Sequence, residues 1–277
     1  CVHTDLLAAG LIEDPFLDDN ENRLTWIGRS GWDYETVFTW HDDSHERTDL
    51  VCEGLDTVAT IELNGVAIAT TANQHRSYRF SVRELLHEGE NTLRVRFASP
   101  LAYAEARRAE LGDRPGSYPA PYQFIRKMAC NFGWDWGPAL VTSGIWRPIG
   151  LHSWSGARLA SVRPLVCTDG PDGRVEVHVT LERTGDAPLT LTAQVAGVVV
   201  ETVLAAGERE AVLALRVPAP RLWWPRGYGA QDRYDLTVHL SEHTGEPGKA
   251  GETGESGATL EEWTGRVGFR DVRLDRT

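Results

Sequence analysis

Short runs in which every second residue is apolar dominate this chain. Residues 92–97 and 175–181 alternate in this way, which is the period of a β-strand with one buried face. Residues 57–69 form two apolar arms around Asn64-Gly65, a pair that favours the positive φ angles of a two-residue hairpin turn. Outside residues 101–111, where Ala, Glu and Arg predict a helix, nearly all of the chain has the pattern of short strands and turns. We therefore predict an all-β fold.

The pattern restarts after Ser155-Gly156, so we expect two domains, residues 1–156 and residues 157–277. In the second domain we expect strands at residues 175–181, 189–204, 211–217, 234–240 and 267–274. A spacing of about 8–12 residues with Gly and Pro turns is typical of an immunoglobulin-like sandwich, here without a Cys…Trp…Cys framework. We interpret the Gly- and Glu-rich segment 244–258 as a flexible hairpin tip that carries no chemistry.

Composition narrows the classes of function. The chain has 277 residues and a formal net charge of −12, which argues against nucleic acid as a partner because nucleic-acid binding needs a basic face. No apolar run approaches the roughly 18 residues that span a membrane, and no signal peptide is visible, so we expect no membrane partner and a cytoplasmic location. The four cysteines match no zinc or redox spacing and are expected to be buried free thiols. Among 28 basic residues only Lys127 and Lys249 are lysine, a bias typical of a GC-rich genome.

The most distinctive motif is Asn-Phe-Gly-Trp-Asp-Trp-Gly-Pro at residues 131–138, which follows a Pro- and Gly-rich loop at residues 112–122. Indole faces stack on the C–H surfaces of sugar rings, and a carboxylate accepts hydrogen bonds from hydroxyl groups. Trp134 and Asp135 are therefore candidate carbohydrate-binding residues, with the Asp135 carboxylate expected to be buried between Trp134 and Trp136. The alternative is that both tryptophans are packing residues and that Asp135 only caps a turn.

Hydrolysis of a glycosidic bond requires two carboxyl groups that face each other across the bond. The acidic doublets at residues 18–19, 42–43 and 261–262 do not meet this requirement, because neighbours on a strand point to opposite faces. Asn20-Glu21 is a dipeptide of the kind that glycosidases use for the acid/base, but we expect it in an acidic loop with no catalytic role. We therefore assign no catalytic residue to this chain.

Two further clusters have structural explanations. His41 and His45 are four residues apart, but the segment between them has a turn composition, so we expect no metal site there and no cofactor or metal elsewhere. The sequence Trp-Trp-Pro at residues 223–225, with Tyr228 and Tyr234, could form a second sugar platform. We interpret it instead as an aromatic corner that packs the second domain, because Pro and Gly surround it.

In combination, these motifs resemble the N-terminal part of the β-mannosidases of glycoside hydrolase family 2. The resemblance covers essentially the whole chain, in the right order. Its motifs lie at residues 1–7, 14–16, 19–21, 32–34, 63–65, 89–93, 132–138, 144–148, 222–229 and 267–270. The Trp-Trp-Pro and Gly-Phe-Arg elements look common to the wider family, whereas Phe-Gly-Trp-Asp-Trp-Gly-Pro at residues 132–138 points to the mannosidase branch.

The resemblance implies a jelly-roll domain of the galactose-binding type, an immunoglobulin-like sandwich and then a (β/α)₈ barrel. It implies retaining hydrolysis of terminal β-D-mannose by two glutamates of the barrel, so the chain is expected to be an N-terminal fragment of an exo-acting enzyme. The start at Cys1 also looks truncated relative to family members. The implied partners are a β-mannoside oligosaccharide and the protein's own barrel domain, with Trp134 and Asp135 in contact with the sugar. Another family 2 activity (exo-glucosaminidase or galactosidase) and a stand-alone carbohydrate-binding module remain alternatives.

Overall fold

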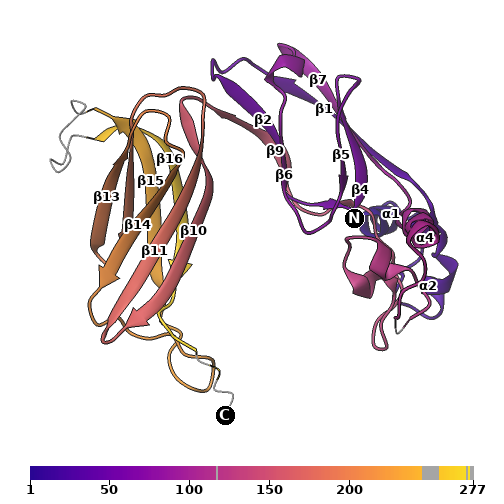
Figure 1. Ribbon diagram of the computed structural model, residues 1–277. Helices are drawn as coiled ribbons and strands as arrows, with labels where there is room; N and C mark the ends of the chain where they lie inside the picture. Colours follow the sequence, from indigo (N-terminus) through magenta and orange to yellow (C-terminus); the bar gives the residue numbers. More distant parts are fainter. Residues whose placement is uncertain (117, 245–255, 273, 275–277) are drawn as a thin grey trace. The chain divides into compact units, whose positions relative to one another are not determined.

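A computed structural model describes residues 1–116, 118–244, 256–272 and 274 of the chain (Figure 1). The chain forms two compact units, Cys1–Ser153 and Trp154–Thr277. Each unit is built from β-sheets and has a buried apolar cluster of its own. This confirms the predicted all-β fold class. No helix among the described residues is long and apolar enough to cross a membrane.

The first unit opens with three short helices, α1 (Val2–Ala8), α2 (Asn20–Arg23) and α3 (Trp26–Arg29). The expectation of strands and turns outside residues 101–111 is therefore wrong for this segment. Helices of this length are marginal by local propensity alone and depend on packing. Here Val2, Leu24 and Ile27 form a buried cluster that supplies this packing.

Two sheets form the sandwich of the first unit, and apolar residues of both sheets are buried together. One sheet has the order β1 (Trp32–Trp40), β7 (Gly89–Phe97), β4 (Val58–Leu63), β5 (Val66–Ala72). The other has the order β6 (Tyr78–Ser81), β2 (Arg47–Cys52), β9 (Ile149–Trp154), and a short pair joins β3 (Leu55–Asp56) to β8 (Gly144–Ile145). The arrangement confirms the expected jelly-roll domain.

The predicted hairpin is present between β4 and β5. Asn64 and Gly65 have φ angles of 51° and 81°, the left-handed pair that this turn requires. The Asn64 side-chain amide donates to the Leu85 carbonyl at 2.7 Å, and its oxygen accepts from the Thr92 amide at 2.9 Å. The turn residue therefore also ties the hairpin to β7, the predicted alternating strand.

The predicted helix is α4 (Pro100–Leu111), which begins one residue earlier than expected. The Ser99 hydroxyl caps it by accepting from the Ala102 amide at 3.0 Å and donates to the Gly28 carbonyl at 3.0 Å. Three 3₁₀ turns complete the unit: η1 (Arg83–Leu85), η2 (Tyr122–Phe124) and η3 (Ala129–Phe132). The last two lead the chain from α4 toward the Trp-Asp-Trp motif.

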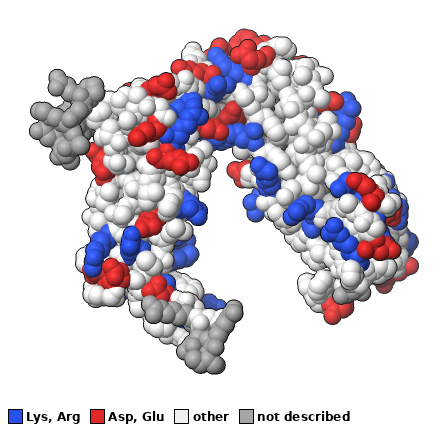
Figure 2. Space-filling view, in the orientation of Figure 1, with Lys and Arg blue, Asp and Glu red and all other residues white. Residues whose placement is uncertain are grey.

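Charged side chains of both signs are interspersed on the face drawn in Figure 2. Charged side chains also pair across neighbouring strands of the first unit. Arg94 on β7 lies 2.8 Å from Glu35 on β1, and Arg96 lies 2.9 Å from Glu62 on β4. Exposed pairs of this kind contribute little to stability, and they support the register of the sheet.

The second unit is a sandwich of two sheets. One has the order β10 (Ala157–Asp169), β11 (Asp172–Arg183), β14 (Glu210–Val217). The other has the order β13 (Val198–Leu204), β12 (Leu189–Val195), β15 (Tyr234–His243), β16 (Ser256–Val267). Alternate residues of β11, from Val175 to Leu181, are buried in the core as predicted. Burying each such side chain contributes roughly 1.5–3 kcal/mol to the stability of the folded unit. This shared core between two antiparallel sheets is the arrangement expected of an immunoglobulin-like sandwich.

The end of the chain differs from the prediction. The strand expected at residues 267–274 is absent from the described part of that segment, because β16 ends at Val267 and Val272 is exposed. The true strand has a mostly polar sequence and gains its order by pairing with β15, from Tyr234↔Val267 onward. Of the predicted hairpin tip at residues 244–258, residues 245–255 lie outside the described residues, and residues 256–258 belong to β16.

Candidate functional site

The Trp-Asp-Trp motif forms a tight turn in the first unit. The Trp134 amide donates to the Gly137 carbonyl at 3.2 Å, and the Gly137 amide donates back to the Trp134 carbonyl at 3.2 Å. Gly133 precedes the turn with a φ angle of 101°, which residues other than glycine rarely adopt. Trp134 is 44% exposed and Trp136 is 80% exposed, so both indoles are accessible at the turn.

Asp135 is also exposed at this turn. The expectation of a carboxylate buried between two tryptophans is therefore wrong for this chain: a two-residue turn directs its central side chains away from the backbone that it closes. Within the described part of the chain, the Asp135 carboxylate has no hydrogen-bond partner. Its lone pairs are thus available to a ligand.

An aromatic neighbour reaches the turn from the preceding loop. The ring of Tyr118 lies 5.6 Å from that of Trp134, centroid to centroid, at an interplanar angle of 40°. Tilted aromatic pairs at this separation are favourable. The Pro- and Gly-rich loop at residues 112–122 was predicted to lead the chain to the motif, and it also supplies a side chain that packs beside Trp134.

The backbone on both sides of the motif is held by two side chains, the partly exposed Glu21 and the buried Gln74. Glu21 accepts a hydrogen bond from the Ala139 amide at 2.8 Å. On the other side, the Gln74 amide donates to the Arg126 carbonyl at 2.9 Å, and the Gln74 side-chain oxygen accepts from the Met128 amide at 2.9 Å. Glu21, for which we expected no catalytic role, makes a contact with the loop that sequence reasoning missed.

A buried ion pair lies at the base of the loop. The Lys127 ammonium contacts both carboxylate oxygens of Asp56, at 2.5 Å to Oδ1, and donates to the Thr142 hydroxyl at 2.8 Å. The Thr142 hydroxyl donates to Asp56 Oδ2 at 2.6 Å, and the Thr57 hydroxyl donates to Asp56 Oδ1. Burial lowers the pKa of Lys127 below its usual value, and the neighbouring Asp56 carboxylate opposes this effect. The only sequence signal for this pair was that Lys127 is one of two lysines in an arginine-rich chain.

His3 is buried close to this base. The neighbouring Val2 amide donates to the Ser143 carbonyl at 2.9 Å. Burial lowers the pKa of His3, and the positive charges of Lys127 and of the chain's amino terminus lower it further. Burial and both neighbouring charges therefore favour the neutral form of the His3 imidazole.

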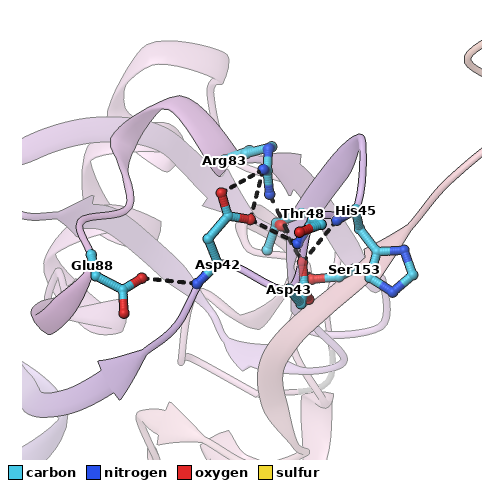
Figure 3. Close-up of polar contacts among 8 residues, drawn as sticks. Asp42, Asp43, His45, Thr48, Arg83, Glu88 and Ser153 are labelled. Carbon is cyan, nitrogen blue, oxygen red and sulfur yellow. Dashed lines mark hydrogen bonds and ion pairs between the residues drawn. The ribbon is translucent and has the colours of Figure 1, made fainter.

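The acidic doublet at residues 42–43 lies in a surface network of hydrogen bonds and ion pairs (Figure 3). Arg83 donates to both oxygens of Asp42, at 2.8 Å and 3.0 Å, and lies 3.9 Å from Asp43. The hydrogen bonds from Arg83 and from the Ser44 amide lower the pKa of Asp42. Glu88 accepts from the Asp42 amide at 3.0 Å and contacts His41 at 2.6 Å, which lowers the pKa of Glu88. These carboxylates are committed to structural contacts.

The other doublets also make separate contacts. Asp19 pairs with Arg23 at 2.9 Å, whereas Glu261 accepts from the Leu159 amide and Glu262 lies 3.5 Å from His239. Among the described residues, no group of three or more His, Cys, Asp or Glu side chains is placed to hold a metal ion. The two carboxylates of a doublet thus contact different partners in the pair Glu261 and Glu262, which lies on β16; residues 18–19 and 42–43 lie outside strands, where the alternation argument does not apply.

The aromatic segment of the second unit forms a packed corner. The Trp223 amide donates to the Phe269 carbonyl at 3.0 Å, and Tyr234 packs edge-on against the fully buried Phe269 at 5.5 Å. The Arg270 guanidinium lies 4.8 Å from the centre of the Trp224 ring. Trp223 and Tyr234 make the contacts expected of a structural corner, whereas Tyr228 is 82% exposed and Trp224 is 40% exposed.

The cysteines are free, as predicted, in the part of the chain that the structure describes. Their burial differs from the prediction. Cys52 is buried, Cys1 and Cys130 are partly exposed, and Cys167 is exposed. Cys167 lies on β10, where alternate residues face the solvent.

Comparisons with known proteins agree with this architecture. A family described as "Glycosyl hydrolase 2 galactose-binding domain-like" matches residues 1–147, and one described as "Glycosyl hydrolases family 2" matches residues 160–270. The beta-mannosidase of Capra hircus is 32% identical over 265 residues, which cover 86% of this chain and 30% of that protein. Beta-mannosidase B of Thermothelomyces thermophilus is 34% identical over 253 residues, with 86% and 29% covered. The chain thus spans about 30% of the length of the curated relatives that it matches.

Solved structures give the same result. A beta-D-mannosidase from Dictyoglomus thermophilum superposes with a TM-score of 0.86 at 33% identity, over 99% of this chain and 33% of that one. The exo-chitosanase CsxA from Amycolatopsis orientalis superposes with a TM-score of 0.71 at 22% identity, over 98% of this chain and 29% of that one. At that identity the second likeness concerns the fold alone.

Proposed function

The chain belongs to glycoside hydrolase family 2, and from this premise we propose that it is the substrate-positioning, N-terminal part of an exo-acting retaining β-mannosidase. The observation that carries the proposal is the similarity to the Dictyoglomus thermophilum β-D-mannosidase, at 33% identity over 99% of this chain. The curated relatives cited above are also named beta-mannosidases. The exo-chitosanase is less similar, at 22% identity, and does not favour a glucosaminidase.

In the proposed reaction, one carboxylic acid protonates the leaving oxygen and a second carboxylate attacks the anomeric carbon to form a glycosyl-enzyme, which water then hydrolyses. We assign both groups to a (β/α)₈ barrel beyond these 277 residues. The substrate is a β-mannoside oligosaccharide, and the barrel is the intramolecular partner of this chain.

This chain contributes recognition of the terminal sugar. Trp134 offers an indole face for stacking on the sugar ring, and Asp135 accepts hydrogen bonds from sugar hydroxyls. Both side chains are exposed at a turn whose backbone is closed by two hydrogen bonds. Contacts that strengthen as the ring distorts toward the transition state raise kcat, so the two residues are expected to affect catalysis as well as binding.

The full-length protein should be assayed on a panel of aryl β-D-glycosides. We expect the highest kcat/KM on the mannoside, with retention of the β configuration in the first product seen by NMR. A preference for the glucosaminide or the galactoside would overturn the substrate assignment in favour of another family 2 activity. Sugar binding without hydrolysis would indicate a binding module, and the 277-residue chain alone is expected to give no turnover.

A further inference from the structure

The loop that carries the Trp-Asp-Trp turn begins and ends at a single carboxylate. Lys127 immediately precedes residues 128–141 and Thr142 immediately follows them. Both donate to Asp56, and they are also bonded to each other, Lys127 Nζ to Thr142 Oγ1, at 2.8 Å. Asp56 lies in β3, so the two ends of the loop are fixed to the same point of the sandwich.

Burial makes this cluster unusual. The Lys127 side chain is 0% exposed and that of Asp56 is 3% exposed. Removing both charges from water costs several kcal/mol per ion, and well-packed apolar residues often replace such a pair without loss of stability. Stability alone therefore does not explain the pair, whereas a requirement for defined geometry does.

The side chains of Lys127, Thr142 and Asp56 are suited to holding the base of the loop in one geometry. An ammonium group has three donors around one atom, so Lys127 reaches both oxygens of Asp56 and the Thr142 hydroxyl together. The planar guanidinium of an arginine is larger and directs its donors along fixed lines. This chain has 28 basic residues and uses lysine at only one other position, Lys249.

We propose that Asp56, Lys127 and Thr142 are positioning residues that close the base of residues 128–141 and hold Trp134 and Asp135 in the geometry that binds the terminal sugar. The proposal rests on the proposed function of the loop. It assigns no contact with substrate to the three residues. Glu21, which holds the Ala139 amide, restrains the same loop at a second point.

The test compares Lys127→Met, Thr142→Val and Asp56→Asn in the full-length protein. Hydrogen exchange of peptides from residues 128–141 should become at least about tenfold faster in each variant, because the loop base opens more often. A displacement of about 1 Å at a binding group can reduce rate by about a hundredfold, so kcat/KM on the aryl β-mannoside should fall by about ten- to a hundredfold. Thr142→Ser retains the hydroxyl, so its loop exchange rate and its kcat/KM should both be close to the wild-type values. Thr142→Val, which removes one donor, also serves if Lys127→Met does not fold.

Arg79→Met is the matched control. It breaks another ion pair of the first unit, in which Arg79 lies 2.8 Å from the nearly buried Asp49. Both residues of this pair lie on the sheet β6-β2-β9, outside the loop. We expect this variant to lower Tm while loop exchange and kcat/KM stay at wild-type values. If Lys127→Met and Thr142→Val behave in the same way, the cluster is only structural and the positioning proposal is wrong.

Asp135→Asn separates the two proposals. If it lowers kcat/KM while the three positioning variants do not, the function of the loop stands and the positioning role fails. If the wild-type protein does not act on β-mannosides, the proposed function fails, and the exchange of residues 128–141 still decides whether the cluster holds the loop.

Discussion

Asp135 carries its charge at the tip of a tight turn, where water solvates it, whereas Lys127 and Asp56 carry theirs at the buried base of the same loop. The exposed Asp135 carboxylate stays hydrated, so its charge carries no desolvation penalty, and it can accept hydrogen bonds from a ligand. The buried charges are tolerable only because they satisfy each other. Substitutions at the tip should therefore change kinetics, and substitutions at the base should also change the stability of the loop.

Asp135→Asn preserves the shape of the side chain and removes its charge. Each charge-assisted bond to a sugar hydroxyl contributes roughly 1.5–3 kcal/mol. We therefore expect kcat/KM of the full-length enzyme to fall by about ten- to a hundredfold or more, at ~1.4 kcal/mol per decade. Tm should not change, because the side chain is exposed. Unchanged kcat/KM with a lower Tm would instead identify Asp135 as a turn residue.

Trp134→Ala removes the indole face that we assign to stacking and the contact with Tyr118. Sugar binding should weaken, seen as a rise in KM or in the inhibition constant of mannose. Trp136→Ala, at the more exposed position, is the comparison variant. Equal effects of the two substitutions would argue against a specific stacking role for Trp134.

The two thiols at Cys52 and Cys167 should differ strongly in reactivity. Burial raises the pKa of Cys52 to about 12, so at pH 8 it is a buried thiol and not a thiolate. Cys167 is exposed on β10. We expect Ellman's reagent to label Cys167 rapidly and Cys52 only after denaturation, and Cys167→Ser should remove the corresponding fast phase. Rapid labelling of Cys52 in the native protein would contradict its burial.

Among the elements of the first unit, the polar contacts in Figure 3 join the loop after β1 to η1, and β2 to β9, its neighbour in the same sheet. Arg83 of η1 contacts Asp42 and Asp43 in the loop after β1, and Ser153 at the end of β9 lies 3.1 Å from Thr48 on β2. The network therefore holds one end of the sandwich together by side-chain contacts. The Asp42 and Asp43 carboxylates are exposed, so the contribution of their ion pairs with Arg83 to stability is modest and depends on pH and salt.

Asp42→Asn tests this network through its pH dependence. Arg83 lowers the pKa of Asp42 in the folded protein below its ordinary value of 3.8. A lowered pKa stabilises the folded state at pH values above the unfolded-state pKa, and this stabilisation is lost as the pH falls through the folded-state pKa. Asp42→Asn should thus lower Tm slightly at pH 7, and the difference should shrink as the pH falls below about 4.

In the whole molecule, each unit has its own apolar core. The core of the second unit draws on both of its sheets and includes fully buried residues such as Leu191 and Phe269. A unit with a closed core of its own is expected to fold without its neighbour. The first unit carries the candidate site, and the second serves as a scaffold in the proposed enzyme.

Residues 154–277 expressed alone should unfold cooperatively in urea. Leu191→Ala leaves a cavity in the core and should reduce the free energy of unfolding by about 2–5 kcal/mol. Val199→Ala, at an exposed position of β13, should change it by no more than about 0.5 kcal/mol. Gradual, non-cooperative unfolding of the isolated unit would show that it depends on the rest of the chain.

The sequence by itself determined those features that depend on local geometry. Alternation identified β7 and β11, Asn64-Gly65 identified the hairpin, and the family motifs identified the two-domain architecture, which the family comparisons confirm. Local signals of this kind report which face of a strand is buried and which φ angles a turn permits. They failed for α1–α3 and for β16, whose order comes from packing and strand pairing.

The tertiary structure alone decided how the loop is held. Asp56 and Lys127 are 71 positions apart in the chain, and Glu21 and Ala139 are 118 apart. No periodicity connects residues at such separations, because their proximity follows from the path of the whole chain through both sheets. For the same reason the sequence suggested a sugar-binding role for Asp135 but placed its carboxylate in a buried site, whereas the folded turn exposes it.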